Sequence, residues 1–293
     1  MTLLGFRCRC RCRRDRACPV PTTKRRNNET TQRNIQISKN EIPNKKTVKK
    51  YTMNPLLYSD SKEIEIVYED DYCIVVNKPN NLLVHHSYFS RNIEEDSLVQ
   101  LLKLQGYETP IPVHRLDRKT SGLLLLAKGT EYVKPFQELF DSQNISKKYI
   151  ALVRGFVEGE GVIDSPVKND RGNYKEALTH YKGLNSIEIA IPVEPYATAR
   201  YSYVEFEPKT GRMHQLRIHA NKISHPIIGD HKYGNRHHNQ LFEEKFELPN
   251  LFLHAFQLIF KHPFLEKEIN QIGEKPLFWK EFEDKIKDFI LQE

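Results

Sequence analysis

The residues best suited to chemistry lie in one short segment, HRLDRKTSG, which spans residues 114–122. In this segment a single carboxylate, Asp117, stands between the guanidinium groups of Arg115 and Arg118. Neighbouring cations favour the ionised carboxylate, so Asp117 is expected to be charged at neutral pH and available as a nucleophile or electrostatic stabiliser. Taken alone, an Asp in a turn more often makes a local hydrogen bond or a surface ion pair.

A second polar segment, TGRMHQLRIH, covers residues 210–219, and the sequence HPIIGD follows it at 225–230. We predict a helix over residues 212–222 whose apolar side carries Met213, Leu216 and Ala220. The polar side of that helix carries Arg212, Gln215 and His219. Arg217 is the residue type that pairs with a carboxylate or phosphate through two parallel hydrogen bonds. A solvated helix face is the ordinary interpretation of such a pattern.

A third segment, KKYIALVRG, places Tyr149 at the beginning of an apolar run, directly after Lys147 and Lys148. A tyrosine in this position is most often a core or edge aromatic residue. Beside cations, however, an aromatic ring can also stack on an unpaired base of RNA. The segment is therefore compatible with an RNA site.

The histidines do not have the spacing of a metal site. His214, His219, His225 and His231 are separated by five, six and six residues, whereas a helical zinc pair is separated by four. No HExxH sequence accompanies them. The sequence therefore predicts no metal ion, and a histidine-ligated metal hydrolase is left only as an alternative.

The elements that must position these segments follow one another irregularly. Strands are predicted at residues 64–68, 72–76, 123–127, 149–153, 201–206 and 256–260, and helices at 96–104, 212–222 and 277–291. This order favours an α+β fold around a mixed sheet over regular βαβ winding. The glycine-rich motifs GxGxxG and GxxxxGK[ST] are absent, which disfavours an enzyme with a nucleotide cofactor.

Charge is unevenly distributed along the 293 residues, whose net charge is +7. Residues 1–52 contain 15 Lys+Arg and 3 Asp+Glu, a net +12, so residues 53–293 carry a net −5. Within the latter, residues 114–236 contain 19 Lys+Arg and 14 Asp+Glu, a net +5. We therefore expect a nucleic acid to bind locally, through the central segment that also carries the polar motifs.

The first 52 residues have no apolar pattern that could form a core, and they contain four of the five cysteines. We predict a disordered basic extension there, with a translation start at Met53 as a sharper hypothesis. The extension lacks the apolar region of a signal peptide, although its arginine content fits a transit peptide. It also lacks the paired CxxC knuckles that are typical of a zinc site. Cys73 is the only cysteine of the patterned part, and no apolar run reaches membrane-spanning length, so the sequence predicts a cytoplasmic location.

Together and in this order, the three segments resemble the RluA-type family of pseudouridine synthases. The resemblance covers nearly all of residues 64–264, and HRLDRKTSGLLLLAK is its most specific motif. VNKP before it, with LHA and HPF near the end, supports the assignment. Within the family, the chain is most similar to the synthases that modify uridine 65 of tRNA, and residues 1–52 are not expected to form the S4-like domain that precedes many rRNA-modifying relatives.

The resemblance implies that residues 53–293 form a pseudouridine synthase domain, with a mixed, mainly antiparallel sheet, flanking helices and a central basic cleft. It implies that Asp117 is the catalytic aspartate and that Arg217 pairs with it. Tyr149 would stack on the target base and assist in proton removal, and Arg115 would help to displace the target from its helix. Weaker RNA contacts are expected from Arg118, Lys148, Arg212, His214 and Gln215.

The implied reaction breaks the N1–C1′ bond of uridine, turns the uracil and rejoins it through C5. Because all atoms are conserved, neither a cofactor nor a metal is expected. The enzyme must flip the base and hold both fragments. Besides the metal hydrolase, two alternatives stay open: an rRNA synthase of the same family, and a non-catalytic RNA-binding protein in which Asp117 is structural.

Overall fold

The computed structural model describes residues 63–86, 95–169 and 171–291. The chain divides into two units, residues 1–54 and 55–293, and all described residues belong to the second. The predicted basic extension and the alternative start at Met53 lie outside the described residues and stay predictions. Of the helices that the structure describes, none is both long and apolar enough to cross a membrane.

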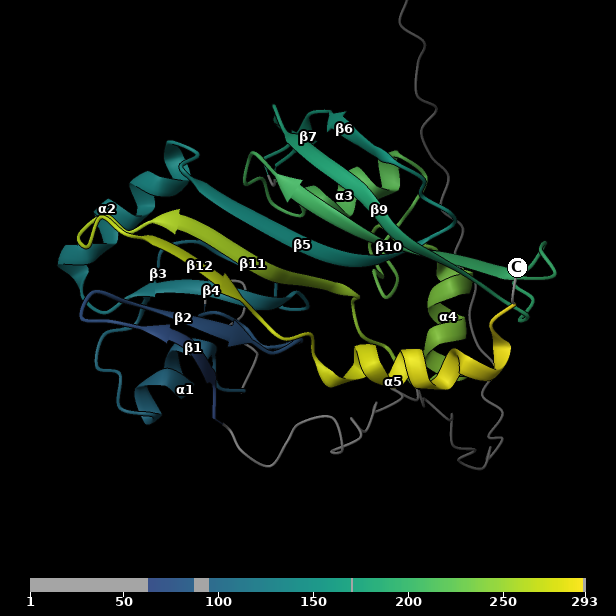
Figure 1. The fold of residues 1–293 in the computed structure, drawn as a ribbon, viewed down its shortest axis with the longest axis horizontal. Helices are drawn as coiled ribbons and strands as arrows, with labels where there is room; N and C mark the ends of the chain where they lie inside the picture. Colours follow the sequence, from purple (N-terminus) through teal and green to yellow (C-terminus); the bar gives the residue numbers. More distant parts are fainter. Residues whose placement is uncertain (1–62, 87–94, 170, 292–293) are drawn as a thin grey trace, which may run out of the picture. The chain divides into compact units, whose positions relative to one another are not determined.

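Within the described ranges, ten strands form one sheet that runs through the whole unit (Figure 1). Its order is β1 (Glu65–Glu69), β2 (Cys73–Lys78), β4 (Ser121–Ala127), β11 (Leu253–Lys261), β5 (Ile145–Arg154), β10 (Ala199–Pro208), β9 (Leu178–Ile189) and β6 (Glu160–Asp164). In addition, β12 (Glu268–Ile272) pairs with β11, β3 (Ile111–Pro112) pairs with β4, and β7 (Val167–Lys168) forms a separate hairpin with β8 (Tyr174–Lys175). Only β4 and β11 run parallel among these pairs, so the predicted mixed, mainly antiparallel α+β fold is confirmed.

The described helices are α1 (Leu98–Leu104), α2 (Thr130–Asp141), α3 (Gln215–Lys222), α4 (Arg236–Glu244) and α5 (Leu277–Ile286). The helix predicted over 212–222 begins only at Gln215, because His214 has a left-handed backbone with φ of 54°. The Gln215 side chain accepts a hydrogen bond from the Arg212 amide at 3.0 Å, which fixes this lead-in.

The helix predicted over 277–291 is also too long. After Ile286 the chain makes a 3₁₀ turn and then runs beside β9. The amide of Ala190 donates to the carbonyl of Phe289 at 2.8 Å, and the amide of Leu291 donates to that of Glu188 at 2.9 Å. Pairing with β9 thus replaces the last turn of the predicted helix.

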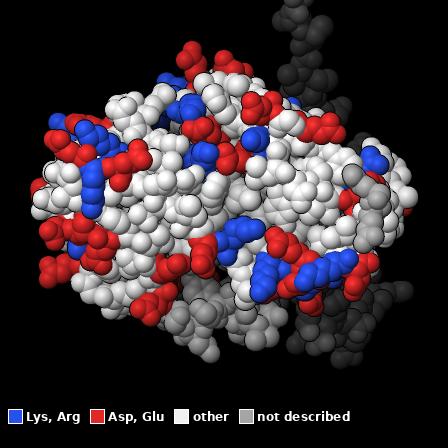
Figure 2. Space-filling view, viewed as in Figure 1, with Lys and Arg blue, Asp and Glu red and all other residues white. Residues whose placement is uncertain are grey.

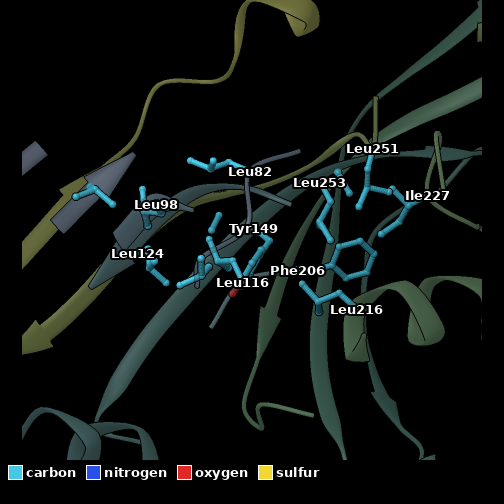
Figure 3. Close-up of a cluster of buried hydrophobic side chains, with 14 of the residues drawn as sticks. Leu82, Leu98, Leu116, Leu124, Tyr149, Phe206, Leu216, Ile227, Leu251 and Leu253 are labelled. Atoms are coloured by element: carbon cyan, nitrogen blue, oxygen red, sulfur yellow. The ribbon is translucent and has the colours of Figure 1, made fainter. Parts of the chain in front are cut away.

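Alternation along β5 separates two hydrophobic clusters on opposite faces of the sheet. Tyr149, Ala151 and Val153 belong to a cluster that includes Leu116 of the β3–β4 connection and Leu216 of α3. Figure 3 shows Tyr149 beside Leu116, and Leu216 next to Phe206 of the same cluster. On the other face, Leu152 joins the aromatic cluster under α4 and α5, which is formed by Tyr201, Tyr203, Phe242, Phe246, Phe252, Phe278, Trp279 and Phe282. Tyr149 therefore lies on the face that α3 covers.

The parallel contact between β4 and β11 requires Gly122, the last residue of HRLDRKTSG. Its φ is +111°, and a Cβ atom there would overlap the carbonyl oxygen of Ala255. Gly122 is paired with Ala255 in the register, just as Ser121 is paired with His254. The glycine thus lets the end of the motif pack directly against β11.

Charge on the face shown in Figure 2 is mixed, with Lys and Arg interspersed among Asp and Glu. This agrees with the net charge of −5 over residues 53–293. A general attraction to nucleic acid is therefore not expected from this face.

Candidate active site

Asp117 lies in the connection between β3 and β4, which a buried lysine anchors. Lys78 ends β2, is fully buried, and donates to the carbonyl of Arg118 at 3.0 Å. It also donates to the carbonyls of Pro79 at 2.8 Å and Leu82 at 3.1 Å. Burial lowers the pKa of Lys78 to about 7, and the charge of Asp117 opposes that decrease. The amine therefore ties the residue after Asp117 to the turn that follows β2.

Arg217 of α3 links two carboxylates. Its Nη1 donates to Oδ2 of Asp117 at 3.0 Å. Its Nε and Nη2 donate to Oδ2 and Oδ1 of Asp230, at 2.7 and 2.8 Å. Burial alone would lower the pKa of Arg217, but the hydrogen bonds and charge of Asp230, and then of Asp117, raise it above its ordinary value. The guanidinium is therefore a permanent cation held in one plane, with one nitrogen directed at Asp117.

Asp230 belongs to the same candidate site through Arg217, although sequence reasoning did not single it out. Its side chain is only 1% exposed, and Oδ1 also accepts the amides of Lys232 at 2.9 Å and Tyr233 at 3.0 Å. Burial would raise the pKa of Asp230, but its hydrogen bonds to Arg217 lower it. The preceding Gly229 has φ of +78° and lacks room for a Cβ atom, which permits this tight turn. Its place in the HPIIGD sequence was visible, but nothing in the chain indicated its partner.

Tyr149 contributes a ring to the same site from β5. The side chain is 9% exposed, and Figure 3 shows it between Leu116 and Phe206. Burial, and then the charge of Asp117, raise the pKa of the Tyr149 hydroxyl above its ordinary value. The phenol is therefore protonated at neutral pH, which suits stacking of the ring better than proton removal by a phenolate.

His214, the residue directly before α3, lies close to Asp117. Its Nε2 lies 3.6 Å from Oδ2 of Asp117, and its Nδ1 lies 3.1 Å from the hydroxyl of Tyr233. The ring of Tyr233 in turn lies 5.3 Å from Cζ of Arg217, within the range of a cation–π contact. His214 and Arg217 thus flank the carboxylate, and Tyr233 contacts both of them.

A cavity of about 520 Å³ opens over these groups. Its lining includes Asp117, Tyr149, Arg217 and His214. Five Lys and Arg residues line it against two Asp residues; the cations are Arg115, Lys147, Lys209, Arg212 and Arg217. The volume lies within the roughly 300–1,000 Å³ that small-molecule sites have. The structure thus brings the three predicted segments together in one basic cavity.

Two of the predicted RNA contacts, Arg118 and Lys148, have other partners. Arg118 donates to the carbonyl of Asn81 at 3.0 Å and to Glu95 at 2.8 Å. Lys148 pairs with Glu205 at 3.1 Å, on the sheet face opposite Tyr149. These cations are therefore not free groups of the cavity.

Gln215 and His219 do not form the polar, solvated helix face that was predicted, because both are buried. The side-chain amide of Gln215 donates, through Nε2, to the carbonyl of Leu178 at 3.0 Å and to Oγ1 of Thr179 at 2.9 Å. Nδ1 of His219 lies 3.0 Å from the same Thr179 oxygen. Although Gln215 borders the cavity, its polar groups fasten α3 to β9.

Of the two adjacent lysines at the start of β5, Lys147 lines the cavity and Lys148 does not. Lys147 and Tyr149 are two residues apart on β5, so they lie on the same face of the sheet. The amine of Lys147 lies 5.4 Å from the ring centre of Phe140, which stacks on His114 at 4.5 Å. The period of the strand, applied from Tyr149, was the signal that could have identified Lys147.

In the described part of the chain, one group of residues has metal-like spacing: Asp70, Cys73 and His262. The structure explains it as a hydrogen-bonded cluster. Asp70 accepts from the Tyr68 hydroxyl at 2.6 Å and approaches His262 Nε2 at 3.1 Å, while Nδ1 of His262 accepts two main-chain amides. Burial raises the pKa of Cys73, so the thiol stays protonated. These donors do not fit a metal ion, because their lone pairs and protons are already used.

Comparisons with known proteins point to one family. The model of the RNA pseudouridylate synthase family matches residues 71–222. The chain is 38% identical over 229 residues to the tRNA pseudouridine synthase C of Vibrio vulnificus, covering 74% of this chain and 93% of that protein. It is 41% identical over 217 residues to the protein of the same name from Pasteurella multocida, covering 70% and 89%.

Solved structures are similar in fold. The human RNA pseudouridylate synthase domain containing 4 superposes with a TM-score of 0.58 at 26% identity, covering 78% of this chain and 94% of that one. The human RNA pseudouridylate synthase domain containing 1 has a TM-score of 0.59 at 23% identity, covering 79% and 91%. The family model matches just over half of this chain, and the chain covers nearly the full length of relatives that are about 40% identical to it. The chain therefore belongs to the RNA pseudouridylate synthase family.

Proposed function

We propose that this protein converts one uridine of tRNA to pseudouridine and that Asp117 is its catalytic carboxylate. The observation that carries the proposal is the 3.0 Å contact between Asp117 and Arg217 inside a basic cavity that also contains the ring of Tyr149. The relatives named tRNA pseudouridine synthase C support tRNA as the substrate.

The reaction assigns a task to each group. The N1–C1′ bond breaks, the uracil turns, a C5–C1′ bond forms, C5 loses its proton and N1 gains one. Asp117 supplies the carboxylate that acts on the nucleoside, and Arg217 holds this carboxylate in place through its hydrogen bond. The ring of Tyr149 stacks on the flipped uracil, and a protein-enclosed cavity keeps the detached base from diffusing away. Since atoms are conserved, the reaction needs no cofactor or metal.

The cations at the cavity mouth would receive the RNA backbone around the target. Arg115 is exposed and lines the cavity, which fits a role in displacing the target nucleotide from its helix. Arg212 also lines the cavity, and its Nε is fixed by the carbonyl of Glu176 at 3.0 Å. A cytoplasmic location is the corresponding proposal for where the enzyme meets its tRNA.

Uridine 65 is the proposed target, and one experiment tests position and substrate together. Purified protein is incubated with a tRNA transcript, with the same transcript carrying cytidine at position 65, and with large-subunit rRNA. Pseudouridines are then mapped by carbodiimide modification and primer extension. We expect one new pseudouridine, at position 65 of the first RNA. Modification of rRNA alone would transfer the activity to the rRNA alternative, and RNA binding without any pseudouridine would favour the non-catalytic one.

A further inference from the structure

His214 approaches the same oxygen of Asp117 that Arg217 binds. Nε2 of His214 lies 3.6 Å from Oδ2, and Nη1 of Arg217 lies 3.0 Å from it. The first distance is too long for a hydrogen bond but short enough for a strong charge interaction. Asp117 is thus flanked by one permanent cation and by one ring that can change its charge.

The neighbours of the imidazole select one of its neutral forms. A carboxylate oxygen repels the lone pair of an unprotonated nitrogen, so the proton belongs on Nε2, which faces Asp117. Nδ1 then carries the lone pair and accepts a hydrogen bond from the hydroxyl of Tyr233, 3.1 Å away. The amide of Tyr233 donates to Asp230 at 3.0 Å. The turn that holds Arg217 through Asp230 therefore also orients His214.

Charged groups face His214 from three segments. Asp117 approaches from the β3–β4 connection, Arg217 from α3, and Asp230 and Lys232 from the turn before α4. Burial lowers the pKa of His214; the charge of Asp117 opposes this decrease, whereas Arg217 and Lys232 add to it. The ring is therefore neutral at pH 7.

We propose that His214, oriented by Tyr233, is a positioning residue for Asp117 and that the reaction requires its neutral form. The inference rests on the proposed function, in which Asp117 acts on the uridine. When His214 gains a proton, a second positive charge faces Oδ2, and the carboxylate is held by two cations. Its reactivity then falls, so the His214–Tyr233 pair sets the acid limit of pseudouridine formation.

Single-turnover rates on tRNA between pH 5 and pH 8 test this role. His214→Asn is the first variant, because Asn tolerates the left-handed backbone at this position and does not titrate. We expect a lower rate at neutral pH and an acid midpoint at least about 0.5 pH unit below that of the wild type, which is about a threefold gain in relative activity on the acid limb. His237→Asn, an exposed position on α4, is the control and keeps the wild-type profile.

Tyr233→Phe is predicted to move the same midpoint in the opposite direction. It keeps the ring against Arg217 but removes the hydrogen bond that only the unprotonated Nδ1 can accept. The neutral form loses stability, so the acid midpoint rises toward the ordinary histidine value of about 6.5. A purely structural role would lower the rates of both variants without moving their midpoints in opposite directions.

A measurement without RNA separates this inference from the proposed function. The His214 ring is followed by NMR titration in the free protein and assigned by its loss in His214→Asn. Asp117→Asn is expected to lower its titration midpoint, because the variant removes the charge that favours the protonated ring. An unchanged His214 midpoint in Asp117→Asn, or an unchanged acid limb in His214→Asn, overturns the inference. A protein inactive on every RNA refutes the proposed function instead, and the titration still decides whether the two side chains are coupled.

Discussion

Arg217 donates to Asp117 at 3.0 Å although the two residues are 100 positions apart in the sequence. The remaining nitrogens of that guanidinium bind Asp230, so its orientation is fixed before any RNA arrives. A preorganised cation beside the proposed catalytic carboxylate would avoid the cost of reorganising solvent during the reaction. The active site of this synthase is therefore a property of three segments that meet, and of no single motif.

Replacing Asp117 by Asn should abolish pseudouridine formation, with a decrease of more than about 10³-fold. The amide has nearly the same shape but can neither attack the nucleoside nor accept a proton as a carboxylate does. Binding of tRNA should persist, because phosphate contacts supply most of the affinity. Tritium release from [5-³H]uridine-labelled tRNA and a filter-binding assay measure the two effects. Near-normal turnover by the variant would refute the assignment of Asp117.

Replacing Arg217 by Lys should lower the single-turnover rate by about 10²-fold, since an ammonium cannot bind Asp230 through two parallel bonds while reaching Asp117. Arg200→Lys is the matched control. Arg200 forms an exposed ion pair with Glu188, with a nitrogen–oxygen distance of 3.0 Å, and neither residue lines the cavity. We expect the control to react at the wild-type rate. Equal rates for both variants would count against the role of the Asp230–Arg217–Asp117 arrangement.

Replacing Lys147 by Ala should weaken tRNA binding and reduce the slope of log affinity against log salt by about 1, as expected for one lost phosphate contact. Lys148→Ala is the control on the adjacent residue. Its lysine pairs with Glu205 on the opposite face, so neither affinity nor slope should change. Binding measured at several salt concentrations distinguishes them, and a larger effect for Lys148 would contradict the placement of the two side chains.

Acid should destabilise the fold through its buried histidines. Burial lowers the pKa of His238 and of His254 to about 4 each. Between about pH 6.5 and pH 4 the unfolded chain binds these two protons and the folded protein does not, so stability is complete above that window and is lost as the pH falls through it. Each histidine contributes a slope of about 1.4 kcal/mol per pH unit.

Urea unfolding at pH 7.5, 6.0 and 5.0 measures this slope. His254→Gln removes one titrating group together with its contact to Ser121 at 3.0 Å, so the variant should be less stable but also less sensitive to acid. The exposed His237→Gln should leave the slope as it is. A wild-type stability that is constant from pH 7.5 to pH 5.0 would show that the buried rings do not stay neutral.

Local sequence was sufficient for the continuous apolar strands and for the family. The run after Gly122 is continuously apolar, which by itself predicts a buried strand, and every residue of β4 is indeed buried. By contrast, β9 was not predicted, since its residues alternate irregularly and it is stabilised by pairing with β10 over ten residue pairs. Helix α2 was missed as well, and it carries Pro135 in its interior.

The sequence by itself determined which carboxylate stands among cations and which motif surrounds it, because these are relationships between neighbours along the chain. Only the tertiary structure decided that Asp230 holds Arg217, that Lys147 rather than Lys148 faces the cavity, and that Gln215 is buried. Each of these outcomes depends on strand register or on contacts between distant segments. Packing of the sheet and α3 sets those contacts, and no single segment encodes them.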